Sequence, residues 1–151
     1  MAIVMASSSG LGLGSAIALA REGVNVVING RDLERLESAV ESIREIATGE
    51  VRYFQGDIKD PMTASKIVKF AVGEFGKLDH LVTNSGPPPC LHFEEAEDAD
   101  WYESYELLVM SVVRMVREAE PYLRESENGT IVTITSRIVK EPTSTNVLSS
   151  A

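Results

Sequence analysis

A run of small residues occupies positions 6–15, where the sequence reads Ala-Ser-Ser-Ser-Gly-Leu-Gly-Leu-Gly-Ser. Between a strand and a helix, such a loop lets backbone N–H groups approach a phosphate, and the helix N-terminus adds about half a positive charge. The spacing is not that of a P-loop, because no Gly-Lys-Ser/Thr follows. The segment therefore predicts a phosphate-binding loop of another type, and a turn needed only for helix–strand packing is the alternative.

A second candidate position follows the next apolar run. A dinucleotide site places an acidic residue about 20 residues after its glycines, where the carboxylate holds a ribose 2′-hydroxyl. Here Gly30 stands in that place and Arg31 follows it. Because a planar guanidinium suits a phosphate, Arg31 favours NADP over NAD. The alternative is a solvated turn residue that pairs with Asp32 or Glu34.

These positions lie in a regular alternation of strands and helices. Apolar β-branched runs alternate with segments of helical periodicity, and capping residues and glycines separate them. Residues Trp101, Tyr105, Leu108, Val112, Met115 and Ala119 are expected on one face of the longest helix. The predicted strands are 2–5, 24–28, 51–54, 78–83 and 129–135, and the predicted helices are 13–22, 33–48 after the cap Asp32, 61–76 after the cap Asp60, and 98–123.

The alternation predicts one doubly wound α/β domain, with a parallel sheet of the Rossmann type and helices on both faces. A chain of 151 residues is long enough for such a core. Ligands of these sheets bind beyond the carboxyl ends of the strands. The loops that follow the strands are therefore the expected place of the functional site.

Composition excludes several classes of protein. The net charge of −9 comes without clustered Lys and Arg, so nucleic-acid binding is not expected. No apolar run is long enough to span a membrane, and no leader pattern is seen. Cys90 is the single cysteine, which fits a cytoplasmic protein, and neither His80 nor His92 has zinc-site spacing, so no metal is expected.

The first loop resembles the Thr-Gly-x-x-x-Gly-x-Gly segment of the short-chain dehydrogenase/reductase family. Gly10 and Gly12 match the second and third glycines, while Met5 replaces the threonine and Ala6 the first glycine. An alanine there predicts a backbone conformation that tolerates a Cβ atom. The resemblance implies a cofactor-binding loop made of Ser8, Ser9, Gly10, Leu11 and Gly12.

Later loops carry further family motifs in the expected order. The resemblance implies that Asp57 accepts from the adenine amino group and that Ile58 packs on the ring. Asn84-Ser85-Gly86 is similar to the family's Asn-Ala-Gly, which supports the sheet and lines the ribose side. Ser136 matches the serine that hydrogen-bonds the substrate carbonyl. Each motif is weak alone, but each follows its own predicted strand.

The catalytic positions depart from the family pattern. The family uses a tyrosine as general acid/base and a lysine four residues later, and the ungapped match of the tyrosine is Ser149. A serine hydroxyl is a much poorer proton donor than a phenol assisted by a lysine. Leu108 stands where the family has an asparagine in its long helix. The family's last strands and helices have no counterpart among the 151 residues, so residues 1–151 are expected to be the dinucleotide-binding part of a longer chain.

The resemblance implies an NADP-dependent oxidoreductase similar to 3-oxoacyl-carrier-protein reductases. Its substrate would be a small carbonyl or alcohol, and helix 98–123 would pair copies into a homodimer or homotetramer. A nucleotide-binding protein of the same fold without ordinary reductase chemistry is the alternative. A methyltransferase fits least, because it would need an acid where Gly30 and Arg31 stand.

Overall fold

The computed structural model describes residues 1–150, and its centre is a five-stranded parallel sheet in the order β3-β2-β1-β4-β5. All four strand pairings are parallel, and Ile3 of β1 lies between Val27 of β2 and Leu81 of β4. This order confirms the predicted doubly wound α/β class. The strands are β1 (Ala2–Val4), β2 (Val26–Gly30), β3 (Val51–Gln55), β4 (His80–Thr83) and β5 (Thr130–Thr133).

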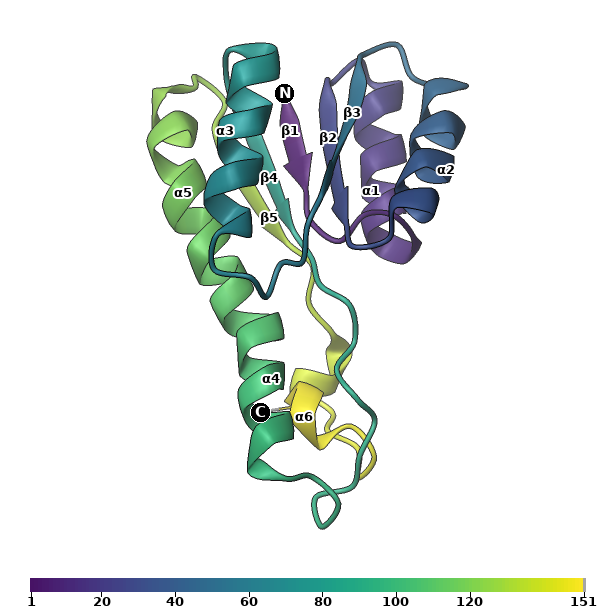
Figure 1. Ribbon diagram of the computed structural model, residues 1–151, viewed down its shortest axis with the longest axis vertical. Helices are drawn as coiled ribbons and strands as arrows, with labels where there is room; N and C mark the ends of the chain where they lie inside the picture. Colours follow the sequence, from purple (N-terminus) through teal and green to yellow (C-terminus); the bar gives the residue numbers. More distant parts are fainter. Residues whose placement is uncertain (151) are drawn as a thin grey trace.

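Helices cover both faces of the sheet (Figure 1). Helices α1 (Gly10–Arg21) and α2 (Leu33–Arg44) lie on one face, and α3 (Thr63–Phe75) and α5 (Ser111–Glu125) lie on the other. Helix α4 (Asp98–Tyr105) joins α5 through the π-helical segment η1 (Glu106–Met110), and the short elements η2 (Arg137–Val139) and α6 (Val147–Ser150) follow β5.

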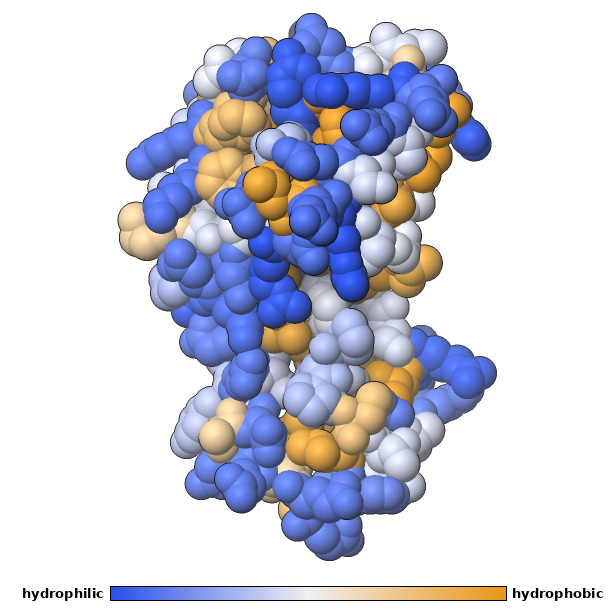
Figure 2. All heavy atoms as spheres, turned by 45° about the vertical axis from the view of Figure 1, so that its right-hand side comes forward, coloured by the Kyte–Doolittle hydropathy of each residue, from blue (hydrophilic) through white to orange (hydrophobic). Residues whose placement is uncertain are grey.

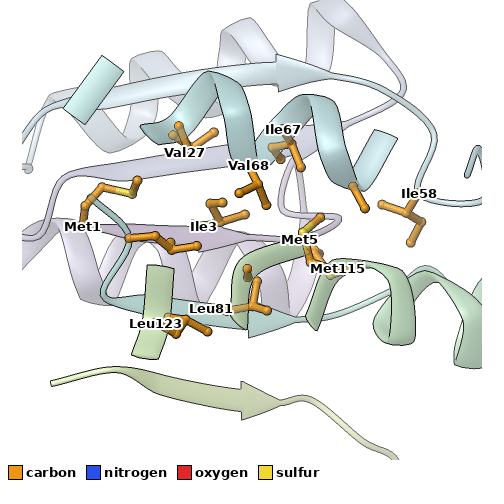
Figure 3. Packing of buried hydrophobic residues seen from close by; sticks show 14 residues of the cluster. Met1, Ile3, Met5, Val27, Ile58, Ile67, Val68, Leu81, Met115 and Leu123 are labelled. Carbon is orange, nitrogen blue, oxygen red and sulfur yellow. The ribbon is translucent and has the colours of Figure 1, made fainter. Parts of the chain in front are cut away.

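Two apolar clusters hold these layers together. Alternate residues along each strand point to opposite faces. Ile3 and Val27 accordingly pack with α3 and α5 (Figure 3), whereas Val4 and Ile28 pack with α1 and α2. The central strands are apolar on both faces because both faces are covered.

Several predicted boundaries shift. Helix α1 begins at Gly10 instead of 13, so the glycine loop itself forms the first turn. Helix α3 begins at Thr63, because Asp60 accepts from the amide of Met62 in a turn that precedes the helix. The cap Asp32 is confirmed, since its side chain accepts from the amide of Arg35. The segment after Pro142 contains the short helix α6.

The long predicted helix is interrupted, and this changes which residues face the core. Met115 and Ala119 are buried as predicted, but Tyr105 is 55% exposed, and Ser104 is buried in its place. A π turn accommodates one extra residue, so every position before it is rotated relative to a regular helix. The stripe that faces the core therefore shifts by one residue, to the buried Ser104 and Ser111 and the half-buried Leu107 between them.

A smaller part of the molecule extends beyond the carboxyl ends of the strands. It contains α4, η2, α6 and the loop that follows β4 (Figure 1), and the outline narrows where it meets the sheet (Figure 2). At the sheet edge β5 is exposed along its whole length, with Ile131 43% and Val132 52% exposed. Among residues 1–150, no strand pairs with the outer edge of β5.

Candidate functional site

A cavity of about 520 Å³ lies at the carboxyl ends of β1, β2, β3 and β4. This is where ligands bind in open parallel sheets. All of the predicted cofactor-binding residues line it except Gly12. They are Ser8, Ser9, Gly10, Leu11, Arg31, Asp57, Ile58, Asn84 and Gly86.

The three consecutive serines of the first loop have different surroundings. Ser7 is fully buried, and its hydroxyl donates to the carbonyl of Val4 at 2.6 Å and accepts from the amide of Asn29 at 3.0 Å. Ser8 and Ser9 face the cavity instead. Ser9 precedes α1 as its N-cap, but its side chain makes no capping bond. Two of the three hydroxyls are therefore placed to meet a ligand, and the third joins β1 to β2.

Ala6 contradicts the expectation of a conformation that tolerates a Cβ atom. Its φ is +44°, in the left-handed region that glycine adopts freely and alanine adopts at a cost. Two asparagines hold this residue from opposite sides. Asn29 Oδ1 accepts from the Ala6 amide at 3.4 Å, and Asn84 Nδ2 donates to the Ala6 carbonyl at 3.0 Å. Such strain persists only where neighbouring contacts determine the conformation.

The two matched glycines serve different purposes. Gly10 has a φ of +58° and open space around its Cβ position, so it is required for its backbone conformation. A Cβ on Gly12 would lie 2.6 Å from the Ala6 carbonyl oxygen and 2.8 Å from Asn84 Nδ2. The missing side chain of Gly12 therefore allows α1 to pack closely against the loop. Gly12 itself does not line the cavity.

Asn29 is a site residue that was not predicted. It is fully buried, and its Nδ2 donates to the carbonyls of Phe54 and Gly56, each at 3.1 Å. With its bond to Ala6, this side chain connects the loop after β1 to the end of β3. The available signal was a polar residue at the end of an otherwise apolar buried strand.

Arg31 lies at the rim of the cavity, with its side chain 73% exposed. Its Nη1 is 3.8 Å from Oδ2 of Asp57, so the pairing is weak. The missing acid also has a physical reason. A Cβ on Gly30 would meet Ser8 Oγ at 3.0 Å and Ser8 Cβ at 3.2 Å, so a side chain there would displace Ser8.

Two charged contacts connect the loop after β3 to the long helix. Lys59 Nζ pairs with Glu103, and Arg114 Nη1 donates to the Lys59 carbonyl at 3.3 Å. Arg114 also pairs with Glu106 at 2.6 Å. Because Lys59 and Glu103 line the cavity, these contacts close its wall beside Asp57. No local sequence pattern indicates this wall, since its residues are far apart in the chain.

The predicted catalytic residues lie outside the cavity lining. Ser136 is exposed, and its hydroxyl accepts from the amide of Ile138 at 3.2 Å. Ser149 is half-buried on α6, and Leu108 is half-buried in η1. The structure therefore gathers the predicted cofactor residues but does not place Ser136 or Ser149 among them.

The described residues contain neither a metal-binding cluster nor a membrane-spanning helix. Within residues 1–150, no three His, Cys, Asp or Glu side chains gather as metal ligands would. In the same range, no helix combines the length and apolar character needed to cross a bilayer.

A parallel sheet with this strand order, covered on both faces and hollowed at its carboxyl ends, defines the Rossmann class of nucleotide-binding folds. Within that class the family is also clear. The family model described as "short chain dehydrogenase" matches residues 1–151, so the chain belongs to the short-chain dehydrogenase/reductase family.

Curated relatives agree with this assignment. 11-beta-hydroxysteroid dehydrogenase A of Sesamum indicum is 32% identical over 142 residues, which are 93% of this chain and 40% of the relative. This chain therefore spans less than half the length of that relative.

Solved structures are similar to almost the whole chain. L-sorbose reductase of Gluconobacter frateurii, in complex with NADPH and L-sorbose, has a TM-score of 0.93 and 32% identity; the match covers 99% of this chain and 57% of that one. The NADH-dependent reductase A1-R′, in complex with NAD, has a TM-score of 0.90 and 25% identity. That match covers 99% of this chain and 64% of the reductase chain. The neighbours thus include proteins bound to either nicotinamide cofactor.

Proposed function

We propose that this chain binds NADPH in the cavity at the carboxyl ends of the strands. The observation that carries the proposal is the rim of that cavity, where Arg31 and Ser8 occupy the region that an acid would fill in an NAD site. Ser8, Ser9 and the first turn of α1 would hold the pyrophosphate. Asp57 and Ile58 would receive the adenine, and Asn84 and Gly86 the ribose side.

We propose that the protein containing this chain is an oxidoreductase. The bound cofactor would exchange a hydride with a small carbonyl or alcohol, and Ser136 would donate a hydrogen bond to the substrate oxygen. Ser136 accepts from the Ile138 amide, so the hydrogen of its hydroxyl is free to donate. To reach a substrate in the cavity, the segment after β5 must move toward it. A resemblance to 3-oxoacyl-carrier-protein reductases makes 3-oxoacyl thioesters the first substrates to test.

One observation favours a second candidate function. Ser149 stands where the family has its tyrosine, and a serine is a weak proton donor near neutral pH. We therefore also consider a nucleotide-binding protein of the same fold without ordinary reductase chemistry. Turnover of a panel of ketones and 3-oxoacyl thioesters by the full-length protein distinguishes the two, because tight NADPH binding without turnover favours the second.

We propose further that copies of the protein associate through residues 98–123. Tyr102, Tyr105, Val109 and Val113 form an apolar strip along this helix and are 38–73% exposed. A contiguous apolar strip of this kind is typical of a protein–protein contact. Residues 1–151 would then be the dinucleotide-binding part of each subunit, with the exposed strand β5 covered by further structure.

The cofactor proposal is tested by fluorescence titration with NADPH and NADH. We expect a lower dissociation constant for NADPH, and we expect Arg31→Ala to weaken NADPH binding about tenfold while leaving NADH binding nearly unchanged. Equal affinity of the unmodified protein for the two cofactors would refute the assignment of Arg31 to a phosphate.

A further inference from the structure

A second guanidinium lies at the same rim of the cavity. Arg35, in the first turn of α2, lines the cavity together with Arg31, Asp32 and Ser8. Its side chain is 71% exposed. The net charge of the whole chain is −9, whereas the cavity lining is balanced, because its carboxylates are matched in number by Arg31, Arg35 and Lys59.

Both arginines are held only loosely. Arg35 Nε lies 3.6 Å from Oδ2 of Asp32, and Arg31 Nη1 lies 3.8 Å from Oδ2 of Asp57. These separations are longer than those of charge-assisted hydrogen bonds, so neither guanidinium is committed to its carboxylate. Exposed pairs of this kind contribute little and are easily exchanged for a better partner.

The backbone around Arg35 is more firmly fixed. The Arg35 amide donates to Oδ1 of Asp32 at 3.1 Å, which anchors the start of α2. The helix therefore presents the Arg35 side chain from a fixed Cα position, while the guanidinium remains free to turn. Arg31, by contrast, stands directly after β2, and its carbonyl accepts from Gln55 Nε2 at 3.0 Å.

We propose that Arg35 is a second residue that determines specificity for NADPH, and that it binds the 2′-phosphate of the adenosine ribose together with Arg31. This inference rests on the proposed function, because it assigns a further residue to the same NADPH site. A phosphomonoester carries between one and two negative charges near neutral pH, with several acceptor oxygens. Two planar guanidinium groups can each offer paired donors to such a group.

The two carboxylates at the rim, Asp57 and Asp32, are expected to have opposite effects on NADPH binding. Displacing Arg31 from Asp57 frees that carboxylate to accept from the adenine amino group. Asp32 retains its capping bond but adds a negative charge close to the phosphate. We therefore expect Asp32 to weaken phosphate binding and Arg35 to strengthen it.

The test uses two small probes that occupy only the adenine half of the site. Adenosine 2′,5′-bisphosphate carries the 2′-phosphate, and adenosine 5′-monophosphate lacks it. We expect Arg35→Ala to weaken calorimetric binding of the bisphosphate about tenfold and that of the monophosphate less than about twofold. Arg35→Lys keeps the positive charge but lacks the paired donors of a guanidinium. Its affinity for the bisphosphate should therefore lie between those of Arg35→Ala and the unmodified protein.

Two further variants sharpen the comparison. Asp32→Asn keeps an oxygen that can cap α2 and removes the charge, so it should bind the bisphosphate about threefold more tightly. Arg124→Ala removes a similarly exposed arginine of α5 that pairs with Glu120 outside the cavity lining, and it should leave both dissociation constants unchanged. Because the Arg35 side chain is exposed and its amide is retained, Arg35→Ala is expected to fold.

The outcomes separate the two proposals. If the unmodified protein does not prefer the bisphosphate to the monophosphate, the NADPH assignment itself fails. If it prefers the bisphosphate and Arg31→Ala abolishes this preference while Arg35→Ala leaves it intact, the proposed function stands and Arg35 has no part in it. An equal loss of both probes in Arg35→Ala would indicate a disturbed helix α2 and would also overturn the specificity role.

Discussion

At the scale of single residues, the glycine loop depends on an alanine in an unfavourable conformation. Ala6 takes the place of the family's first glycine, with a φ of +44°. Asn29 and Asn84 bind its amide and its carbonyl, and Asn84 Nδ2 would also be 2.8 Å from a Cβ on Gly12. Through these bonds, Asn29 joins the strained residue to β2 and to the end of β3, and Asn84 joins it to the end of β4.

Replacing this alanine tests the strain directly. We expect Ala6→Gly to raise the free energy of unfolding by about 1 kcal/mol, because the left-handed conformation costs a non-glycine residue about 1–2 kcal/mol and the added backbone freedom of the unfolded chain offsets part of the gain. Urea denaturation followed by circular dichroism measures the change. Ala20→Gly, inside α1 and fully buried, is the control that should destabilise. A less stable Ala6→Gly protein would contradict the strain argument.

At the scale of elements, the π turn explains both a wrong prediction and a contact. Residues eight apart on a regular α-helix differ by about 80° in direction, whereas one residue absorbed by a π turn reduces this to about 20°. Glu106 and Arg114 are eight apart and form a 2.6 Å ion pair across η1. The π turn thus places the Arg114 guanidinium where it can also reach the Lys59 carbonyl.

Arg114 is therefore expected to matter more than other arginines of the same helix. Its side chain is 17% exposed, whereas that of Arg124 is 79% exposed. We expect Arg114→Gln to lower the free energy of unfolding by about 1–2 kcal/mol, because it leaves Glu106 and the Lys59 carbonyl without this partner. Arg124→Gln should change it by less than about 0.5 kcal/mol. Similar losses for both variants in thermal denaturation would argue against the role of the π turn.

At the scale of the whole molecule, the two ends of the sheet are built differently. The carboxyl ends of the strands open into the cavity. At the amino ends, contacts of Asp79 join neighbouring segments, and its side chain is 13% exposed. Burial opposes ionisation of Asp79, but bonds from the Met1 amine, Lys77 and Ser126, together with the charge of the amine, hold the pKa of this carboxyl well below its usual range. One carboxylate thereby joins the start of β1 to the loop before β4 and the end of α5.

This cluster predicts how stability depends on pH. Because the pKa of Asp79 is lower in the folded protein than in the unfolded chain, its contribution is complete above about pH 4 and is lost progressively as the pH falls below that value. Urea midpoints measured between pH 7 and pH 2 should therefore decrease less steeply for Asp79→Asn than for the unmodified protein. Asp79→Asn should also be less stable at pH 7, and parallel curves with equal midpoints would rule out this linkage.

Local patterns were enough to predict much of the protein. The alternation of apolar runs with helical periodicity identified the parallel α/β sheet, because each element buries a face that its own sequence defines. The glycine loop and Arg31 are indicated because each follows directly on a strand, and in a parallel sheet those strand ends must meet. The resemblance to the family, and not the strand pattern, indicates Asp57 and Asn84. The order of elements and part of the cavity lining are therefore available from the sequence by itself.

Other features were decided only by the tertiary structure, because they depend on contacts between residues far apart in the chain. Asn29 and Asn84 hold Ala6 at its positive φ, and no local sequence pattern predicts these two contacts. The π turn moved the buried stripe by one residue, since helical periodicity assumes an uninterrupted helix. Arg35 is a candidate ligand because the packing of α2 places it beside Arg31 in the cavity lining. The sequence determined which residues end the strands, and the packing of the helices decided which side chains share the cavity with them.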